Sequence, residues 1–155
     1  MKRIAIGSDH AGFLAKQNLI KELKSWGIEV VDVGPSSDEK PVEYVPIAEL
    51  VSVKVAENEV DGGILICGTG VGMSIAANKI PGIRAAVVND LFSAQYAKSD
   101  VNLNVLCMGA RVISERIIME ITKKWVDTNF TGGRFIPRIA QLHEMESKYF
   151  TKGGK

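Results

Sequence analysis

Apolar residues along this chain form two kinds of pattern, short continuous runs and longer segments in which they recur at helical spacing. The continuous runs predict five β-strands, at Arg3–Ser8, Ile28–Val33, Gly63–Cys67, Ile83–Val88 and Val105–Met108. Apolar and polar residues alternate little within these runs. Such runs are typical of strands that are buried on both faces, as in a parallel sheet between layers of helices.

The segments between and after these runs carry apolar residues at the spacing of helices. Gly27 supplies a stop for the first of them, whereas prolines and polar residues over Gly34–Pro46 predict a long loop. The predicted helices contain Leu19–Trp26, Ile47–Val55, Met73–Asn78, Asp90–Ser99, Ile117–Trp125 and a last helix at about residues 135–150.

Five alternations of strand and helix predict an α/β fold of three layers, in which helices cover both faces of a five-stranded parallel sheet. Because we find no internal repeat and no linker, we expect residues 1–155 to form a single domain. The extra C-terminal helix lies beyond the fifth strand–helix unit. It either packs on its own sheet, which the pattern alone favours, or docks on a partner subunit.

The composition excludes several classes of protein. The chain has 155 residues, 46% of them hydrophobic, and a formal net charge of +1, which argues against a general nucleic-acid binder and against disorder. No apolar run approaches the roughly 20 residues of a membrane helix, and the N-terminus does not read as a signal peptide. Cys67 and Cys107 have no metal-ligand or disulfide-framework spacing, so we expect a cytoplasmic protein without a cysteine zinc site.

Ligands of open parallel sheets bind beyond the carboxyl ends of the strands, and this rule selects few residues here. They are Ser8, Asp9 and His10 after the first strand, Cys67 and a glycine loop after the third, Asn89 and Asp90 after the fourth, and Gly109, Ala110 and Arg111 after the fifth. A carboxylate, an imidazole, a thiol and a guanidinium group are therefore expected at one edge of the sheet.

The glycine loop comprises Gly68, Thr69, Gly70, Val71 and Gly72. Its backbone N–H groups and the following helix suit a phosphate, or an oxyanion that forms during a reaction. The loop lacks the Gly-Lys-Ser/Thr ending of a P-loop, and Met73 stands where a dinucleotide fingerprint has its third glycine. Asp90 lies at a distance that suits a ribose ligand, so nucleotide binding stays an alternative, as does a tight turn without ligand.

The titratable residues at this edge each allow two interpretations. Cys67 is either a small buried hydrophobe or a thiol whose thiolate is stabilised by the helix start, which suits proton transfer. Asp9 either caps a helix beside a solvated His10 or orients that imidazole for function. Cys107 lies within a strand and is expected in the core, and His143 is expected on a solvated helix face.

Arg134 and Arg138 flank the predicted start of the last helix, where Pro137 fits an early helical position. Guanidinium groups there would share the helix N-terminus with a bound phosphate. The alternative is that both are ordinary surface arginines.

The stretches Gly7–His10 and Cys67–Gly72 resemble the type B ribose-5-phosphate isomerases, a family with galactose-6-phosphate isomerase subunits and allose-6-phosphate isomerases. The resemblance runs nearly end to end. Further matching stretches are Asp61–Cys67, Ile75–Lys79, Gly82–Ala85, Ser93–Gln95, Asn104–Leu106, Gly109–Arg111 and Gly132–Arg134.

This resemblance implies a Rossmann-like homodimer, or dimers paired into tetramers, that interconverts an aldose phosphate and a ketose phosphate without metal or organic cofactor. It also implies a role for each candidate residue. Cys67 would move the proton with help from Thr69, the N–H groups of Gly68 to Gly72 would hold the enediolate, Asp9 and His10 would bind substrate oxygens, and Arg111 with Arg134 and Arg138 of the partner subunit would hold the phosphate.

Three positions depart from the family pattern. Asp100 stands where ribose-5-phosphate isomerases have a ring-opening histidine, Val101 where they have an asparagine, and Phe135 where a histidine follows Arg134. We therefore expect His10, Asp100 or a bound water to open the sugar ring. Ribose 5-phosphate is the expected substrate, with allose 6-phosphate or galactose 6-phosphate as the alternative. Alternatives of other classes are a nucleotide-binding module and a redox-sensing thiol protein.

Overall fold

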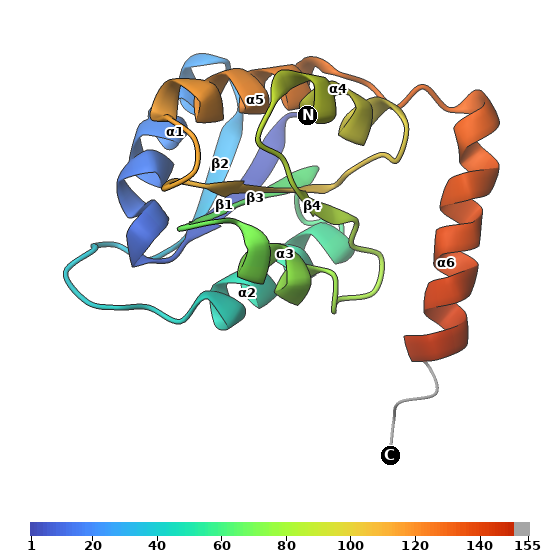
Figure 1. Ribbon diagram of the computed structural model, residues 1–155, viewed down its shortest axis with the longest axis horizontal. Coiled ribbons are helices and arrows are strands. Elements are labelled where there is room, and N and C mark those ends of the chain that lie inside the picture. The colour runs from blue at the N-terminus through green and yellow to red at the C-terminus, as the bar shows by residue number, and fades with distance from the viewer. Residues whose placement is uncertain (151–155) are drawn as a thin grey trace.

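The computed structural model describes residues 1–150 as one parallel sheet between two layers of helices, with a further helix to the side (Figure 1). The sheet has five strands in the order β2-β1-β3-β5-β4, and every neighbouring pair is parallel. The strands are β1 (Arg3–Ser8), β2 (Glu29–Gly34), β3 (Gly62–Cys67), β4 (Ala85–Val87) and β5 (Val105–Gly109). The expected fold class is confirmed.

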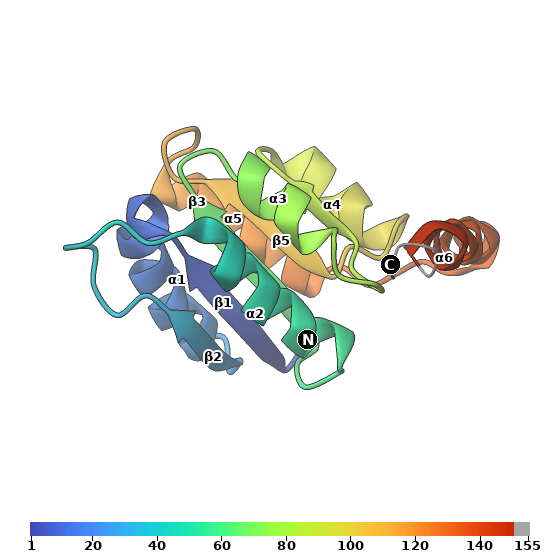
Figure 2. The same ribbon diagram turned by 90° about the horizontal axis from the view of Figure 1, so that it is seen from below.

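Helices cover both faces of the sheet (Figure 2). One face, toward which Ile4 and Ile6 of β1 point, is covered by α1 (Phe13–Ser25), α4 (Leu91–Ser99) and α5 (Glu115–Asp127). Those on the other face are α2 (Tyr44–Ala56) and α3 (Val71–Ala77). The remaining elements are α6 (Ile136–Phe150) and two 3-10 turns, η1 (His10–Gly12) and η2 (Gly133–Phe135).

Successive residues of the central strands point into opposite cores. Ile64 and Ile66 of β3 face α1 and α5, whereas Leu65 and Cys67 face α2 and α3. All six residues of β3 are buried, as are all five of β5. This two-sided burial explains why the strands read as continuous apolar runs rather than as alternating ones. It also fixes the direction in which the side chain of Cys67 leaves the sheet.

Two predicted boundaries are wrong, each for a local reason. α2 begins at Tyr44, so Pro46 lies within the first turn of the helix rather than in the loop. Proline is tolerated there because N–H groups of the first turn have no partner within the helix. β4 is shorter than the predicted Ile83–Val88. The N–H of Ile83 donates to the Ile80 carbonyl in a turn, and side-chain oxygens of Asn104 and Asn78 accept from the two residues that follow Ile83.

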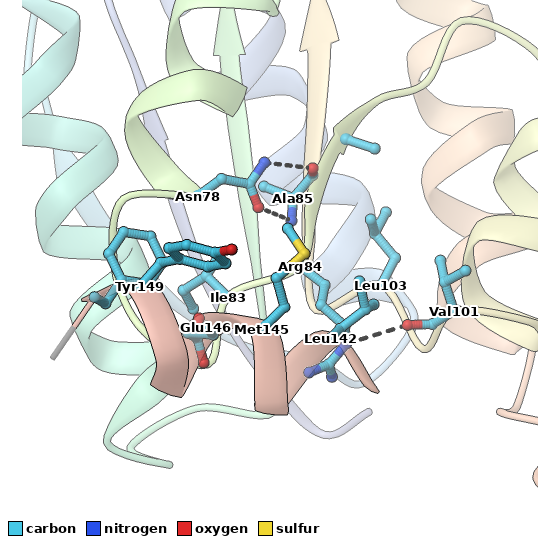
Figure 3. A pocket seen from close by; sticks show the side chains of 12 residues that line it. Asn78, Ile83, Arg84, Ala85, Val101, Leu103, Leu142, Met145, Glu146 and Tyr149 are labelled. Carbon is cyan, nitrogen blue, oxygen red and sulfur yellow. Dashed lines mark hydrogen bonds between the residues drawn. The ribbon is translucent and has the colours of Figure 1, made fainter. Parts of the chain in front are cut away.

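Helix α6 stands beside the β4 edge and covers neither face of the sheet (Figure 1). None of its residues is buried, so the interpretation that the pattern alone favoured, packing on its own sheet, is wrong. Both Glu146 carboxylate oxygens accept from the Gly82 N–H at 2.9 Å. A cavity of about 580 Å³ separates the helix from the segment around Arg84, with Leu142, Met145 and Tyr149 on the helix side (Figure 3).

None of the helices within residues 1–150 is long and apolar enough to cross a membrane.

Candidate active site

A cavity of about 280 Å³ opens at the carboxyl ends of β1, β3 and β5. It gathers the carboxylate, imidazole, thiol and guanidinium group that the sequence places at this edge. Its lining consists of Asp9, His10, Ala11, Tyr44, Cys67, Gly68, Thr69, Gly72 and Arg111.

The end of β1 supplies a carboxylate and an imidazole. Asp9 caps η1, because its Oδ1 accepts from the Gly12 N–H at 3.0 Å, while the residue also lines the cavity. The structure therefore shows the helix cap that was one of the two interpretations, and the orienting of the His10 imidazole by Asp9 stays a prediction. His10 is exposed, and its Nδ1 accepts from the Val42 N–H at 3.4 Å. An accepting Nδ1 leaves Nε2 to carry the proton of the neutral ring.

Cys67 ends β3 with a side chain that is 6% exposed and reaches the cavity lining. Its Sγ accepts from the N–H of Gly70 at 3.0 Å. This hydrogen bond holds the sulfur against the start of the glycine loop. The interpretation of Cys67 as a mere core hydrophobe accounts for neither this contact nor its place in the lining.

The Gly70 N–H reaches the sulfur because the loop turns sharply here. Gly70 has φ +80° and ψ −17°, in the left-handed region. A Cβ on this residue would lie 3.0 Å from the backbone carbon of Met108 in β5. The loop is therefore both the tight turn and the cavity wall. Gly68, Thr69 and Gly72 line the cavity, whereas Gly70 packs on β5.

The side chain of Thr69 lies at the start of α3. Its Oγ1 accepts from the Val71 N–H at 3.3 Å. This contact leaves the hydroxyl proton of Thr69, and the rest of its oxygen, available for a ligand in the cavity. Val71 itself is 51% exposed and does not line the cavity.

Arg111 follows β5 and brings a cation to the cavity. Its backbone N–H donates to the Gly68 carbonyl at 3.0 Å, which ties the loop after β5 to the glycine loop. A Cβ on Gly68 would lie 3.4 Å from Arg111 Cδ, so the arginine side chain crosses close over the glycine. The exposed guanidinium group is suited to bind an anion that enters the cavity.

Tyr44 lines the cavity, although no pattern in the sequence singled it out. Its ring lies against Gly72, where a Cβ would come within 2.8 Å of two ring carbons. Tyr44 reaches the site because it is the first residue of α2, directly after the long loop. The absence of a side chain at Gly72 is what leaves room for the ring.

The family model described as Ribose/Galactose Isomerase matches residues 4–142. The chain belongs to this family. It is 43% identical over 148 residues to ribose-5-phosphate isomerase B of Escherichia coli, covering 96% of this chain and 99% of that one. It is 37% identical over 152 residues to a D-erythrulose-4-phosphate isomerase of Pectobacterium atrosepticum, covering 96% and 99%.

Solved structures of the family agree with this fold. A ribose-5-phosphate isomerase B of Clostridium thermocellum superposes with a TM-score of 0.92 at 41% identity, over 95% of this chain and 99% of that one. The enzyme of Mycoplasma genitalium, solved with bound ribulose 5-phosphate, superposes with a TM-score of 0.91 at 39% identity, over 94% and 97%.

Three side chains that the family resemblance assigns to the site, those of Asp100, Arg134 and Arg138, do not line this cavity. Asp100 caps the carboxyl end of α4, near the amino end of β5, and its Oδ1 accepts from Ser99 Oγ at 2.7 Å. Arg134 and Arg138 flank the start of α6, with guanidinium carbons 4.9 Å and 5.3 Å from the centre of the Phe135 ring. Phe135 is buried, so in this member of the family an aromatic ring positions the two arginines.

Asp90 does not act as a ribose ligand in this geometry. It caps α4, with Oδ1 accepting from the Ser93 N–H and Oδ2 from Ser93 Oγ, both at 2.7 Å. The backbone N–H of Ser93 lowers the pKa of this carboxyl group below its usual value. Because both oxygens are engaged and Asp90 does not line the cavity, the nucleotide-binding alternative loses its main support.

The other groups singled out from the sequence have structural places. Cys107 is fully buried in β5, and burial raises the pKa of its thiol, with a further contribution from Cys67. His143 is exposed on α6, as expected, with Nε2 3.3 Å from Arg84 Nη1. Within residues 1–150, no group of three or more His, Cys, Asp or Glu side chains is arranged to hold a metal ion.

Proposed function

We propose that this protein interconverts ribose 5-phosphate and ribulose 5-phosphate, with no metal or organic cofactor. The observation that carries the proposal is the Cys67 sulfur, which lies in the cavity with the Gly70 N–H at 3.0 Å. Membership of the ribose/galactose isomerase family and the named activity of the relatives support this substrate class.

The reaction needs a base and fixed hydrogen-bond donors. Cys67 as thiolate takes the proton from C2 of the open-chain aldose, which produces an enediolate across C1 and C2, and returns that proton to C1. The hydroxyl proton moves from O2 to O1 in the same exchange, which gives the ketose. Gly68, Thr69 and Gly72, the loop residues that line the cavity, supply donors toward the developing negative oxygen, while the Gly70 N–H stays on the Cys67 sulfur. Thr69 assists as a hydroxyl donor, and Asp9 and His10 bind the remaining substrate oxygens.

Ring opening must precede this proton transfer, because ribose 5-phosphate is largely cyclic. His10 is the candidate that the single chain itself places at the cavity, with Nε2 as donor. Asp100 becomes a candidate when a partner subunit supplies it. A bound water is the third candidate.

We further propose that the active site is shared between the subunits of a homodimer, which can pair into a tetramer. Arg111 of one chain and Arg134 and Arg138 of the partner hold the phosphate in this arrangement. Uncovered apolar side chains support a partner on α6 and on the two helices that flank the β4 edge. They include Val71, Ile75, Phe92, Tyr96, Leu142, Met145 and Tyr149.

The proposal includes a cytoplasmic location. Its support is the family's sugar-phosphate chemistry together with Cys67 and Cys107, which are both free. A reducing compartment preserves the thiol that the reaction needs.

Turnover of ribose 5-phosphate by Cys67→Ala tests the function. We expect kcat to fall by about 1,000-fold or more, because the variant lacks the base. Cys107→Ala is the matched control, since it removes the other thiol from the core and leaves the cavity lining unchanged. A loss below about tenfold in Cys67→Ala contradicts the proton-transfer role.

The same assay with other sugars tests the substrate. We expect faster turnover of ribose 5-phosphate than of allose 6-phosphate, galactose 6-phosphate or erythrulose 4-phosphate, all without added metal. Faster turnover of a six-carbon sugar would instead assign the chain to the other branch of the family. Tight binding of NAD or of a nucleoside triphosphate without any turnover would favour a nucleotide-binding module. Peroxide-sensitive Cys67 without turnover would favour a redox sensor.

A further inference from the structure

A lysine side chain with no exposed surface lies in the first turn of α1 and has no part in the proposed mechanism. Lys16 belongs to α1 and is 0% exposed. Its Nζ donates to Asp32 Oδ1 at 2.6 Å and to the Pro35 carbonyl at 2.8 Å, and it lies 5.5 Å from the centre of the Phe13 ring. Lysine is almost never fully buried unless it is paired, so this arrangement calls for a reason.

Stability alone is a weak reason for a buried ammonium group. Removing an ammonium group from water carries a large free-energy cost, and a buried ion pair of this kind is often no more stabilising than apolar residues of the same volume. An ion pair does, however, define one geometry, because its donors must meet their acceptors. The acceptors of Lys16 are the side chain near the end of β2 and a carbonyl at the start of the β2–α2 loop, residues 35–43.

Asp32 adds to this anchor. Its Oδ1 also accepts from the Gly34 N–H at 3.0 Å, and Gln17 Nε2 lies 3.5 Å from its Oδ2. The pair therefore fixes the point at which the chain leaves β2. From there the loop runs outward and returns to α2 (Figure 1).

The far end of the same loop forms part of the active site. The Val42 N–H donates to His10 Nδ1, and Tyr44, two residues on, lines the cavity against Gly72. On the other side, Lys16 follows Asp9 and His10 by less than two turns of η1 and α1. Lys16 thus connects the loop that holds the His10 ring with the helix that begins beside it.

We propose that Lys16 is a positioning residue for the isomerase, which acts through the β2–α2 loop to hold His10 with Nδ1 as acceptor and Nε2–H toward the substrate. The inference rests on the proposed function for its consequence in catalysis. The tautomer of His10 can be measured without substrate, so the two claims fail separately.

Kinetics of Lys16→Met test the catalytic consequence. Methionine keeps the length and apolar stem but removes the charge and the donors. We expect kcat/KM for ribose 5-phosphate to fall by about 10- to 100-fold, the effect of a misplaced catalytic group. Lys21→Met, on the same helix but exposed, is the control and keeps the activity of the parent protein.

A double-mutant cycle with His10→Ala separates positioning from a general loss of structure. If Lys16 acts through His10, Lys16→Met lowers kcat/KM by less than about threefold once His10 is absent. An equal loss in both backgrounds overturns the proposal. A thermal unfolding scan of each variant shows whether it is folded at the temperature of the assay, so that the kinetics of folded proteins are compared.

Nitrogen NMR of the imidazoles tests the geometry directly. The chain has two histidines, so His143 serves as an internal reference. We expect the neutral His10 ring to show the Nε2–H form, and Lys16→Met to shift it toward the mixture of tautomers of free imidazole while His143 stays unchanged. An unchanged His10 spectrum overturns the inference, whatever the activity.

If Lys16→Met does not fold, Asp32→Ala provides the same test from the other side. The Asp32 side chain is 38% exposed, and its removal takes away the acceptor of Lys16 and of the Gly34 N–H. The expected NMR shift is the same. If the parent protein turns over no sugar phosphate, the proposed function fails, and the tautomer experiment still decides whether Lys16 positions His10.

Discussion

At the scale of single residues, the chemistry of the site depends on one backbone conformation. The Gly70 N–H points back to the Cys67 sulfur because Gly70 adopts φ +80°. A Cβ on Gly70 would lie 3.0 Å from the backbone of Met108 in β5. A glycine at this position therefore serves both the sulfur and the packing of the loop.

Gly70→Ala is expected to lower the free energy of unfolding by about 2–5 kcal/mol, through left-handed strain and crowding against Met108. It should also lower kcat, since the N–H no longer keeps its place at Cys67. Gly27→Ala is the matched control, with φ +77° and open space around its Cβ. We expect that control to cost about 1 kcal/mol by strain alone, with kcat unchanged. Urea unfolding measures the loss of unfolding free energy in both variants, and equal losses would contradict the crowding of Gly70→Ala against Met108.

At the scale of elements, α6 differs from the five helices that cover the sheet. It has an apolar stripe but no buried residue, and it touches the body through few polar contacts. The strongest is the pair of bonds from Gly82 to the Glu146 carboxylate. The helix also begins where Arg134 and Arg138 flank the Phe135 ring, so its orientation sets where these two cations lie.

We expect Glu146→Ala to free α6 from the loop around Gly82. Amides of residues 136–150 should exchange hydrogen on the order of tenfold faster, which corresponds to the loss of one charge-assisted hydrogen bond. Exchange in β1, β3 and β5 should not change. Glu144→Ala is the control, because that side chain is exposed on the same helix. If both variants exchange alike, Glu146 does not anchor the helix.

At the scale of the whole molecule, the groups that we propose for the active site occupy two separate regions of one chain. Cys67, Asp9, His10 and Arg111 meet in the cavity at the carboxyl ends of the strands, whereas Asp100, Arg134 and Arg138 do not line it. A homodimer related by a two-fold axis would unite the two regions in two equivalent sites.

Complementation between inactive variants tests this arrangement. Co-expression of Cys67→Ala with the double variant Arg134→Ala/Arg138→Ala should restore about one quarter of the parent activity. About half of the dimers formed by random pairing are mixed, and each mixed dimer has one intact site of two. Cys67→Ala with Thr69→Ala is the control and should restore nothing, since both residues belong to the same half of the site. Failure of the first pair to recover activity, with mixed dimers present, would place all functional groups in one chain.

The sequence determined the order of the elements, the parallel sheet and the edge at which the chemistry lies. Two-sided burial leaves continuous apolar runs, and strand ends and glycines are local signals, so β1, β3, β5, Cys67 and the glycine loop could be located from the pattern. Roles for Thr69 and Arg134 came from the family resemblance, whose motifs span the chain. Only the tertiary structure decided what depends on contacts between distant segments. The first residue of α2 brings Tyr44 to the site, Ser93 engages Asp90, α6 stands beside the sheet instead of packing on it, and Lys16 is buried against Asp32. Three-dimensional packing, which no local spacing encodes, brings these groups together.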